Sequence, residues 1–319
     1  MKEYAFGIDL GGTTAKIGLF KTTGELLEKW EVPTDTSNAG EHILKNLAAA
    51  VQGKMQEKGL AAEQVEGVGV GVPGPVLDSR IVPIICANLG GWGKHNVAEE
   101  LGGMLSGIKV LVGNDANVAA LGEIWMGAAK GCRSAVMVTL GTGVGGGLII
   151  NGQLVRGRDF TAGEYSFMNT NADAWSDGKK SMACQCSTSA LLDAYRARRQ
   201  LPADAPMNGR LFFDAANAGE PEALEVLEAF CMAVDVQIYN LSVLLDLEKV
   251  AIGGGISGQP LLIETLDRVY EEKILKGHPF GEEQARSLPR PEIVPCAFHN
   301  EANQIGALVS YLNAFYPQK

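Results

Sequence analysis

The stretch AFGIDLGGTTAKIGLF, residues 5–20, decides the fold of this chain. Two β-type runs flank a turn of small residues, and a third run follows at 26–32. The pattern returns as AVMVTLGTGVGGGLII, residues 135–150, with its own third run at 153–156 after an Asn-Gly turn. In the first copy, helical patterning follows at 41–58. This repetition predicts two similar α/β lobes, each built on a three-stranded meander with helical crossovers.

Both turns contain more glycine than a turn requires. Successive backbone N–H groups in such a turn form an anion-binding nest that needs no basic side chain. Two lobes that present these turns to each other would hold phosphate groups from both sides. The alternative is that the hairpins are unrelated and their glycines serve only the turns, but turns seldom need so many.

Length and composition narrow the function classes. At 319 residues the chain exceeds the usual size of one domain, which favours two. Its net charge of −10 disfavours nucleic acid or an anionic membrane as the main partner, whereas a nucleotide with a metal ion stays compatible. We find no signal-type segment and no apolar run of about 18 residues, and the six cysteines are scattered. We therefore expect a cytoplasmic protein with reduced thiols.

A second informative stretch is VLVGNDANVAALGE, residues 110–123, which reads as an apolar strand, an Asn-Asp break and a helix. Carboxylates at strand ends are frequent catalytic groups. Asp115 lies between Asn114 and Asn117, whose amides can hydrogen-bond a polyhydroxylated ligand without titrating. Asp115 is therefore a candidate base for a sugar hydroxyl. The residues alone also allow a structural role, in which Asp115 caps the helix that begins near residue 116.

Other glycine-rich strands complete the pattern. A strand at 65–74 runs into Pro-Gly-Pro, and a strand at 249–257 runs into three glycines before a helix at 260–273. An amphipathic closing helix is predicted at 300–315. Two G-x-G-x-x-G matches, in the first of these strands and in the second hairpin, lack the helix that a dinucleotide fingerprint requires. The chain contains no P-loop motif.

Four motifs occur in one order: DLGGTTAK (9–16), Asn114-Asp115, GTGVGGG (141–147) and GGG (253–255). With the repeated lobes, they make the chain resemble the ROK family of glucokinase-like bacterial sugar kinases. The resemblance implies a two-lobed, actin/hexokinase-like α/β fold, which is a duplicated ribonuclease H-like unit, with ATP and sugar in the interlobe cleft. It implies a small N-terminal lobe of residues 1–115 plus 300–319 and a large C-terminal lobe of residues 116–299.

The resemblance also implies roles for single residues. ATP with Mg²⁺ would bind the first hairpin through five residues, which are Asp9, Gly11, Gly12, Thr13 and Lys16. Asp9 would lie near the metal ion. A second phosphate hairpin would comprise Gly141, Thr142, Gly143 and Gly145, and Gly254 and Gly255 would lie against the adenosine. The sugar would meet Asn114, Asp115, Glu164 and Gly74. Asp115 would accept the proton of the hydroxyl that attacks the γ-phosphoryl group.

The chain departs from the zinc motif that is usual in this family. Phe167 stands where the family has a histidine, and Cys184-Gln-Cys186 keeps only a C-x-C. Structural zinc needs four nitrogen or sulfur ligands, and too few lie nearby in sequence. We therefore expect no zinc site and two ordinary thiols.

Two assignments near this departure stay open. Asp193 either matches a second sugar-binding glutamate of the family or, in the register that we favour, is an acid on a helix surface. Phe167, Tyr165 or Trp175 could present an apolar wall to a substituted sugar. Phe167 could equally fill the space of the missing metal.

These observations predict an enzyme that transfers a phosphoryl group from ATP to the 6-hydroxyl of a hexose, with glucose as the first choice. The alternatives are a kinase for N-acetylmannosamine or a β-glucoside, which zinc-free family members phosphorylate, and a sugar-binding sensor without catalysis. A non-kinase ATPase of the same fold is a third option. A binding-only protein need not keep a base, so Asp115 disfavours the sensor. The resemblance also implies a homodimer or homotetramer.

Overall fold

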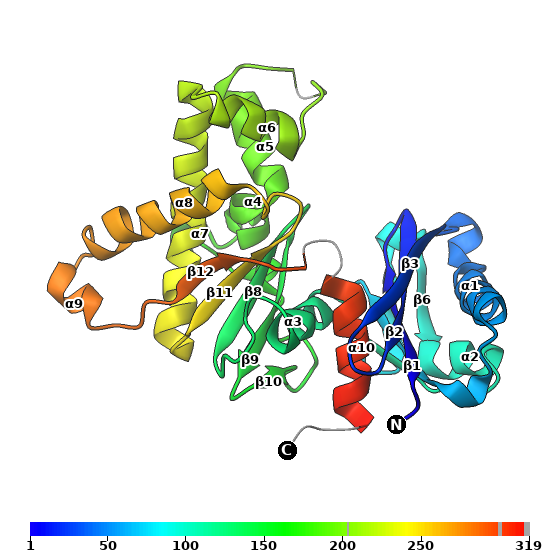
Figure 1. Cartoon of the computed structure of the whole chain (residues 1–319). Helices are drawn as coiled ribbons and strands as arrows, with labels where there is room; N and C mark the ends of the chain where they lie inside the picture. The colour runs from blue at the N-terminus through cyan, green and yellow to red at the C-terminus, as the bar shows by residue number, and fades with distance from the viewer. Residues whose placement is uncertain (203, 299–301, 316–319) are drawn as a thin grey trace. The chain divides into compact units, whose positions relative to one another are not determined.

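The computed structural model describes residues 1–202, 204–298 and 302–315, and the chain divides into two compact units (Figure 1). Unit 1 comprises Met1–Trp125, Arg156–Ala162 and Glu301–Lys319, and unit 2 comprises Met126–Val155 and Gly163–Asn300. Unit 1 therefore extends past the expected division at residue 115. The expected division between residues 299 and 300 lies outside the described residues.

Unit 1 is built on a five-stranded sheet with the order β3-β2-β1-β4-β7. β2 is antiparallel to β1 and to β3, whereas β4 and β7 run parallel to β1. The strands are β1 Tyr4–Leu10, β2 Thr14–Lys21, β3 Leu26–Pro33, β4 Val65–Val72 and β7 Val110–Asn114. The predicted meander is thus confirmed, and so are the strand predicted at 65–74 and the strand predicted before Asn114, which are β4 and β7.

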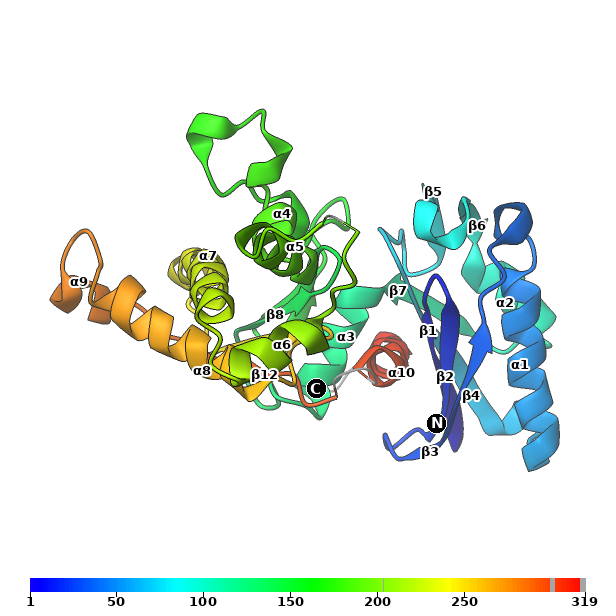
Figure 2. The same ribbon diagram turned by 90° about the horizontal axis from the view of Figure 1, so that it is seen from above.

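Helices cover both faces of this sheet. They are α1 Ile43–Lys58, α2 Val97–Met104, α3 Asp115–Trp125 and α10 Ala302–Phe315. The apolar side chains of α1 and α2 share one core with Phe6, Ile8, Val68 and Val70 of β1 and β4. Because side chains alternate along a strand, the glycines between them face the other side, where α10 packs against the sheet and against α3 (Figures 1 and 2). This packing explains why α3 belongs to unit 1.

Glycine on that face allows α10 to approach the sheet backbone. A Cβ at Gly69 would lie 1.9 Å from the Ala307 carbonyl oxygen, and a Cβ at Gly7 would lie 2.1 Å from the Gln304 carbonyl oxygen. No other residue type fits such a distance. The alternation of glycine and valine in β4 therefore separates an aliphatic core on one face from close helix packing on the other.

Smaller elements complete unit 1. A two-stranded hairpin pairs β5 Ile81–Cys86 with β6 Trp92–Asn96. The short helices are η1 Ser37–Gly40, η2 Ala62–Gln64 and η3 Ala87–Leu89. The hairpin follows the Pro-Gly-Pro loop at the end of β4, and Ile84 and Cys86 of β5 lie within 4 Å of the Cβ position of Gly74.

Unit 2 repeats the sheet of unit 1. Its order is β10-β9-β8-β11-β12, with β9 antiparallel to β8 and to β10, and with β11 and β12 parallel to β8. The strands are β8 Ala135–Leu140, β9 Val144–Ile150, β10 Gln153–Val155, β11 Lys249–Gly253 and β12 Glu292–Pro295. The predicted duplication is confirmed because both sheets have the same strand order and the same strand directions.

The helices of unit 2 gather around a separate core. They are α4 Met182–Cys186, α5 Thr188–Arg198, α6 Gly209–Asn217, α7 Pro221–Leu245, α8 Pro260–Val269 and α9 Glu282–Arg286, with short helices η4 Tyr165–Phe167, η5 Ala172–Ala174 and η6 Gly178–Lys180. The predicted helix at 260–273 is α-helical to Val269 and continues as the π-helix η7, Tyr270–Leu275.

Helix α7 is the longest helix of unit 2, at 25 residues. It is long and apolar enough to cross a membrane by length and composition, although 56% of its most apolar window is buried in the protein. Polar residues such as Gln237 and Asn240 interrupt its apolar sequence. Among the described residues it is the one helix that meets this criterion, and burial identifies it as a core helix of unit 2.

Candidate active site

The carboxyl ends of β1, β4 and β7 meet at one edge of the unit 1 sheet. In the strand register, Asp9 lies beside Gly71, and Gly71 lies beside Gly113. Asn114 and Asp115 follow directly. With strands about 4.8 Å apart, the backbones of Asp9 and Gly113 are roughly 10 Å apart. The structure thus brings together three predicted segments of unit 1, at the edge where parallel α/β sheets commonly bind ligands.

The turn between β1 and β2 has the carbonyls of Gly11 and Thr13 occupied and two amides available. The Gly11 amide donates to the Thr14 carbonyl at 3.1 Å. Thr34 donates from its amide to the Thr13 carbonyl at 2.9 Å and from its hydroxyl to the Gly11 carbonyl at 2.7 Å. The amides of Gly12 and Thr13 donate to no residue that the structure describes. This arrangement suits an anion.

Asp9 and Lys16 place opposite charges beside this turn. They pair across the β1–β2 hairpin, and Asn303 Nδ2 of α10 donates to Asp9 Oδ1 at 2.9 Å. Burial raises the pKa of Asp9, while the Asn303 hydrogen bond and the Lys16 charge act to lower it. The described residues contain no group of three or more His, Cys, Asp or Glu arranged for a metal.

Asn114, rather than Asp115, caps helix α3. Its Oδ1 accepts the Asn117 amide at 3.0 Å, and its Nδ2 donates to the Gly74 carbonyl at 3.1 Å. Asp115 is the first residue of α3, and its Oδ1 accepts the Ala116 amide at 2.8 Å. The interpretation of Asp115 as the cap is therefore wrong by one residue. The side chain of Asp115 is half-buried at the sheet edge.

The loop after β4 is fixed from several sides. Cys86 Sγ donates to the Pro73 carbonyl at 3.3 Å, next to the Gly74 carbonyl that Asn114 holds. Burial raises the pKa of the Cys86 thiol, and the nearby charge of Asp115 raises it further. Gly74 has a φ of +83°, a conformation that favours glycine. Gly74 and Asn114 are thus hydrogen-bonded to each other, Asp115 follows Asn114, and Cys86 Sγ lies next to Gly74.

The same loop is fastened further along by a residue that follows β10. Arg156 Nη1 donates to Ser79 Oγ at 2.6 Å, and the Ser79 carbonyl accepts the Val112 amide of β7 at 2.8 Å. Burial lowers the pKa of Arg156. Arg156–Ala162 belongs to unit 1 although the residues on either side belong to unit 2.

The turn between β8 and β9 in unit 2 has the same pattern of backbone hydrogen bonds as the first turn. The Gly141 amide donates to the Gly143 carbonyl at 3.0 Å. Thr188, at the start of α5, donates its amide to the Gly141 carbonyl at 2.9 Å and its hydroxyl to the Leu140 carbonyl at 2.8 Å. The amides of Thr142 and Gly143 donate to no described residue. Two independent turns therefore offer two amides each.

Ser166 secures the second strand of this hairpin. Its Oγ accepts the Val144 amide and donates to the Val144 carbonyl, each at 2.9 Å. The neighbouring Gly145 pairs with Thr139 of β8. The Thr139 hydroxyl is buried without a hydrogen-bond partner among the described residues.

The three glycines after β11 lie against the second hairpin. Gly254 has a φ of +94°, and a Cβ there would lie 2.2 Å from the Leu140 carbonyl oxygen. Gly255 has no described atom within 4 Å of its Cβ position. The structure therefore explains Gly254 by packing within unit 2, whereas Gly255 faces open space.

Glu164 follows the second hairpin and precedes η4. Its side chain is half-buried, and burial raises its pKa. Gly163 allows close approach there, because a Cβ on it would lie 2.9 Å from the Gly146 carbonyl oxygen. The carboxylate of Glu164 contacts no hydrogen-bond donor of the described residues.

The three aromatic residues proposed for an apolar wall have different environments. Tyr165 is buried in the core of unit 2, and its hydroxyl lies 3.5 Å from the Gly147 carbonyl oxygen, so it cannot belong to a wall. Phe167 is 83% exposed and Trp175 is 78% exposed. The interpretation of Phe167 as filler for a missing metal is therefore wrong, because a filler would be buried.

The C-x-C pair and Asp193 have ordinary environments. Cys184 is exposed, and burial raises the pKa of Cys186 to about 12. Helix α5 begins directly after this pair, with Ser187 as its cap. Asp193 lies on the exposed face of α5 and pairs with Arg196 at 2.7 Å. This placement agrees with the register that makes Asp193 a surface acid.

Sequence reasoning missed the residues that hold the site. Thr34, Thr188 and Ser166 orient the two turns, Asn303 orients Asp9, and Cys86 holds the Gly74 loop. Asn303 could have been suspected because a polar side chain at the start of the closing helix precedes an apolar pattern. The others lie far from the turns in sequence and belong to no motif.

Comparison with known proteins gives a consistent result. The sequence matches the ROK family over residues 5–312. It is 32% identical to a glucokinase of Halalkalibacterium halodurans over 272 residues, which cover 79% of this chain and 80% of that protein. It is 29% identical to a beta-glucoside kinase of Listeria monocytogenes over 316 residues, with 98% of each covered. The structure of a ROK family glucokinase from Streptomyces griseus in complex with glucose and AMPPNP aligns with a TM-score of 0.77 at 27% identity, covering 96% of this chain and 98% of that one.

Proposed function

The chain belongs to the ROK family, and we propose that it transfers the γ-phosphoryl group of ATP to the 6-hydroxyl of a hexose, with glucose as the first candidate. The fold is of the actin/hexokinase type, and the chain is an ATP-dependent sugar kinase by its relatives and by the neighbour that carries AMPPNP. The 6-hydroxyl, the identity of the sugar and the roles of single residues are the parts that we propose.

One observation carries the proposal. In both units, the turn after the first strand has two carbonyls bonded to protein, those of Gly11 and Thr13 and of Gly141 and Gly143. Each turn also leaves two amides without an acceptor among the described residues, at Gly12 and Thr13 and at Thr142 and Gly143. Such a pair of amides is a binding site for an anion. We propose that these turns hold the phosphates of ATP, together with Gly11 and Lys16 in unit 1 and with Gly141 and Gly145 in unit 2. Gly255, which has open space at its Cβ position, would face the adenosine.

We propose that Asp9 receives Mg²⁺ with the nucleotide. The carboxylate is oriented by Asn303, and its neighbours include the free amides of the first turn. When bound, the metal ion would neutralise charge on the phosphates. The chain would keep the Asp9 carboxylate oriented toward the metal ion, and it would keep Lys16 close to the same phosphates.

We propose that Asp115 is the general base. Asp115 accepts the proton of the 6-hydroxyl as its oxygen forms a bond to the γ-phosphorus and the bond to the ADP oxygen breaks. Asn114 keeps one amide hydrogen and one oxygen lone pair for a sugar hydroxyl, because only one of each is used internally. Gly74 and Glu164 would contact other hydroxyls of the sugar.

The sugar could also carry a substituent. Phe167 and Trp175 are exposed aromatic residues close in sequence to Glu164, and they could contact an aglycone or an acetyl group. The beta-glucoside kinase relatives favour this second candidate. A sensor without catalysis is disfavoured because Asp9 and Asp115 are both present. We also propose a cytoplasmic location and a homo-oligomer.

The test is ADP release measured with glucose, mannose, N-acetylmannosamine, N-acetylglucosamine, allose and cellobiose, each with ATP and Mg²⁺. Glucose should give the highest kcat/KM, and the product should be the 6-phosphate by phosphorus NMR. A higher value with cellobiose or N-acetylmannosamine would identify a substituted sugar instead. ADP release without sugar would indicate an ATPase, and no release with any sugar would indicate a sensor.

A further inference from the structure

Strand β5 exposes two neighbouring isoleucines at the surface of unit 1. Ile84 is 45% exposed and Ile85 is 57% exposed. The segment 81–91, which contains β5 and η3, carries no charged side chain, although 20% of the whole chain is charged. Single exposed apolar residues are ordinary, but an adjacent pair in an uncharged surface segment is typical of a surface that binds something.

A β-bulge causes this exposure. Side chains alternate along a regular strand, so Ile84 should be buried as Val82 is. Val82 pairs with His95 on β6. Ile85 pairs with Gly93, so β5 takes three steps between the two pairs where β6 takes two. The extra residue breaks the alternation, and Ile84 is exposed together with Ile85.

Gly93 makes the bulge possible. A Cβ at this position would lie 1.9 Å from the Ile84 carbonyl oxygen, so no other residue type fits there without moving β5. Bulges are frequent beside active sites, where they redirect side chains. The sequence therefore uses a glycine to keep an arrangement in which two isoleucines stay exposed.

The exposed pair lies next to the loop that precedes the hairpin. A Cβ at Gly74 would lie 3.5 Å from Ile84 Cδ1. The Gly74 carbonyl is the group that accepts from Asn114 Nδ2 at 3.1 Å. Further along the same segment, the Asn88 carbonyl oxygen lies 2.5 Å from the Cβ position of Gly12 in the first turn. The segment thus contacts both the candidate sugar loop and the candidate phosphate turn of unit 1.

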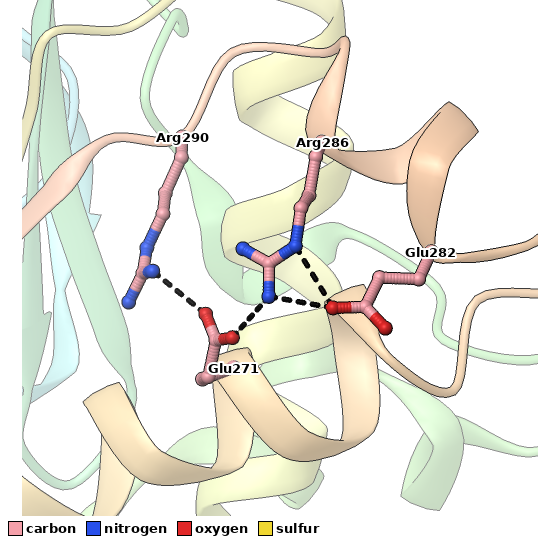
Figure 3. Close-up of polar contacts among 4 residues, drawn as sticks. All are labelled: Glu271, Glu282, Arg286 and Arg290. Atoms are coloured by element: carbon pink, nitrogen blue, oxygen red, sulfur yellow. Dashed lines mark hydrogen bonds and ion pairs between the residues drawn. The ribbon is translucent and has the colours of Figure 1, made fainter.

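An exposed apolar residue of unit 2 has different neighbours. Phe280 is 81% exposed and lies between η7 and α9 in the chain. Glu271 of η7 pairs with Arg286 and with Arg290, and Arg286 also pairs with Glu282 at 2.8 Å (Figure 3). Phe280 is therefore a single ring in a segment that charged residues fasten. The two isoleucines of β5 share an uncharged segment beside the candidate site.

We propose that Ile84 and Ile85 form a subsite for an apolar substituent on the sugar. This subsite rests on the proposed function, because Asn114 and Asp115 are taken there as the residues that hold the sugar. A sugar held by Asn114 lies beside Gly74, and Ile84 is the side chain that packs next to Gly74. A group attached to the sugar on that side would cover the two isoleucines and remove their apolar surface from water.

The side chains of the subsite define the class of substituent. Residues 82–86 carry no charge, and the thiol of Cys86, their only polar side-chain group, already donates to the Pro73 carbonyl at 3.3 Å. Such a surface favours an aryl or alkyl group and offers no side-chain partner to a phosphate or an amino group. The substrate class is therefore a hexose that carries an apolar group, such as an aryl glucoside.

The first experiment compares kcat/KM for phenyl β-glucoside and methyl β-glucoside, each with ATP and Mg²⁺. The wild type should prefer the phenyl compound about tenfold, because its ring buries apolar surface on the isoleucines. Ile84→Ser with Ile85→Ser should reduce this preference to about twofold or less and leave the kinetics with glucose unchanged. Leu27→Ser, on β3 and 40% exposed, is the matched control and should keep the wild-type preference.

A second pair of compounds, N-benzoylglucosamine and N-acetylglucosamine, makes the same comparison for a substituent at another position of the sugar. A preference of about tenfold in either pair, removed by the double substitution, supports the subsite. The absence of a preference in both pairs overturns it. A preference that survives the double substitution assigns the substituent to other residues, such as Phe167 and Trp175, and also overturns the subsite.

The second experiment measures binding without turnover. Calorimetry with the Asp115→Asn chain gives the Kd for each compound, with and without the two serine substitutions, and the ratio of Kd values should change by the same factor as the ratio of kcat/KM. If glucose is bound and is phosphorylated by the wild type but neither pair shows a preference, the subsite is wrong and the proposed function stands. If no sugar binds, the proposed function and the subsite fail together.

Discussion

The two units share a sheet but differ in what they place at its edge. Asp9 and Thr139 occupy the same position, one residue before the end of the first strand. In unit 1 that position carries a carboxylate and lies opposite Lys16 in the hairpin, and in unit 2 it carries a hydroxyl and lies opposite Gly145. Both turns offer two free amides. The backbone of each unit can thus hold an anion, but only the hairpin of unit 1 adds charged side chains.

The comparison continues at the last strand of each sheet. β7 ends at Asn114 and leads directly into α3, which begins at Asp115 and belongs to unit 1. β12 is followed along the chain by α10, which also belongs to unit 1 and packs against α3. The helix that follows the last strand of the unit 2 sheet therefore packs in unit 1. Asn303, on that helix, orients Asp9.

The largest effect should come from the base in unit 1. Asp115→Asn keeps the shape of the side chain but cannot accept a proton, so kcat should fall by about 10²- to 10⁴-fold with little change in the affinity for ATP or sugar. Steady-state kinetics and calorimetry would measure this. Glu164→Gln in unit 2 is the comparison and should raise the KM for sugar more than it lowers kcat. Near-normal turnover by Asp115→Asn would remove Asp115 from the mechanism.

A second prediction contrasts two buried aspartates. In unit 2, burial and the charge of Asp267 raise the pKa of Asp235 to about 9 from its ordinary 3.8, and both carboxylate oxygens lack a hydrogen-bond partner among the described residues. The folded chain therefore binds one proton more than the unfolded chain between these values, and the free energy of unfolding falls as pH rises. From pH 5 to pH 8, Asp235 should cost on the order of 4 kcal/mol.

Urea unfolding at pH 5 and pH 8 would test this contrast. Asp235→Asn should flatten the loss of stability across that range. Asp9→Asn in unit 1 should change it less, because Asn303 and Lys16 offset the burial of Asp9. If Asp235→Asn keeps the wild-type pH dependence, another group titrates in the folded chain.

The sequence predicted more of the backbone than of the packing. Both hairpins, β4, β7, β11 and α1 lie where their patterns placed them, because glycine turns and alternating valines leave few other solutions. The cap of α3 was displaced to Asn114 because Asn and Asp are equally good caps and only geometry separates them. Tyr165 and Phe167 could not be ranked by exposure, since two positions two residues apart in a short helix can face opposite ways. The sequence did not predict helix α7, because polar residues interrupt its apolar pattern. Only the folded structure shows that this helix is buried in the core of unit 2.

The third prediction tests one close approach in each unit. Gly69→Ala would drive a methyl group into the Ala307 carbonyl of α10, and Gly254→Ala would drive one into the Leu140 carbonyl of the second hairpin. Each should destabilise the fold by about 1–3 kcal/mol or more. Gly53→Ala in α1, which has open space, should instead add up to about 1 kcal/mol. Thermal unfolding would measure all three, and an unchanged midpoint for Gly69→Ala would contradict the packing of α10 on β4.

The smallest effect separates the two glycines after β11. Gly255 has open space at its Cβ position, so Gly255→Ala should leave the thermal midpoint unchanged, in contrast to Gly254→Ala. If adenosine lies against Gly255, the added methyl group should cost roughly 1 kcal/mol of nucleotide binding, or about fivefold in the Kd for AMPPNP. Calorimetry with that analogue measures this directly. An unchanged Kd would mean that unit 2 contributes the β8–β9 turn to nucleotide binding but not the glycines that support it.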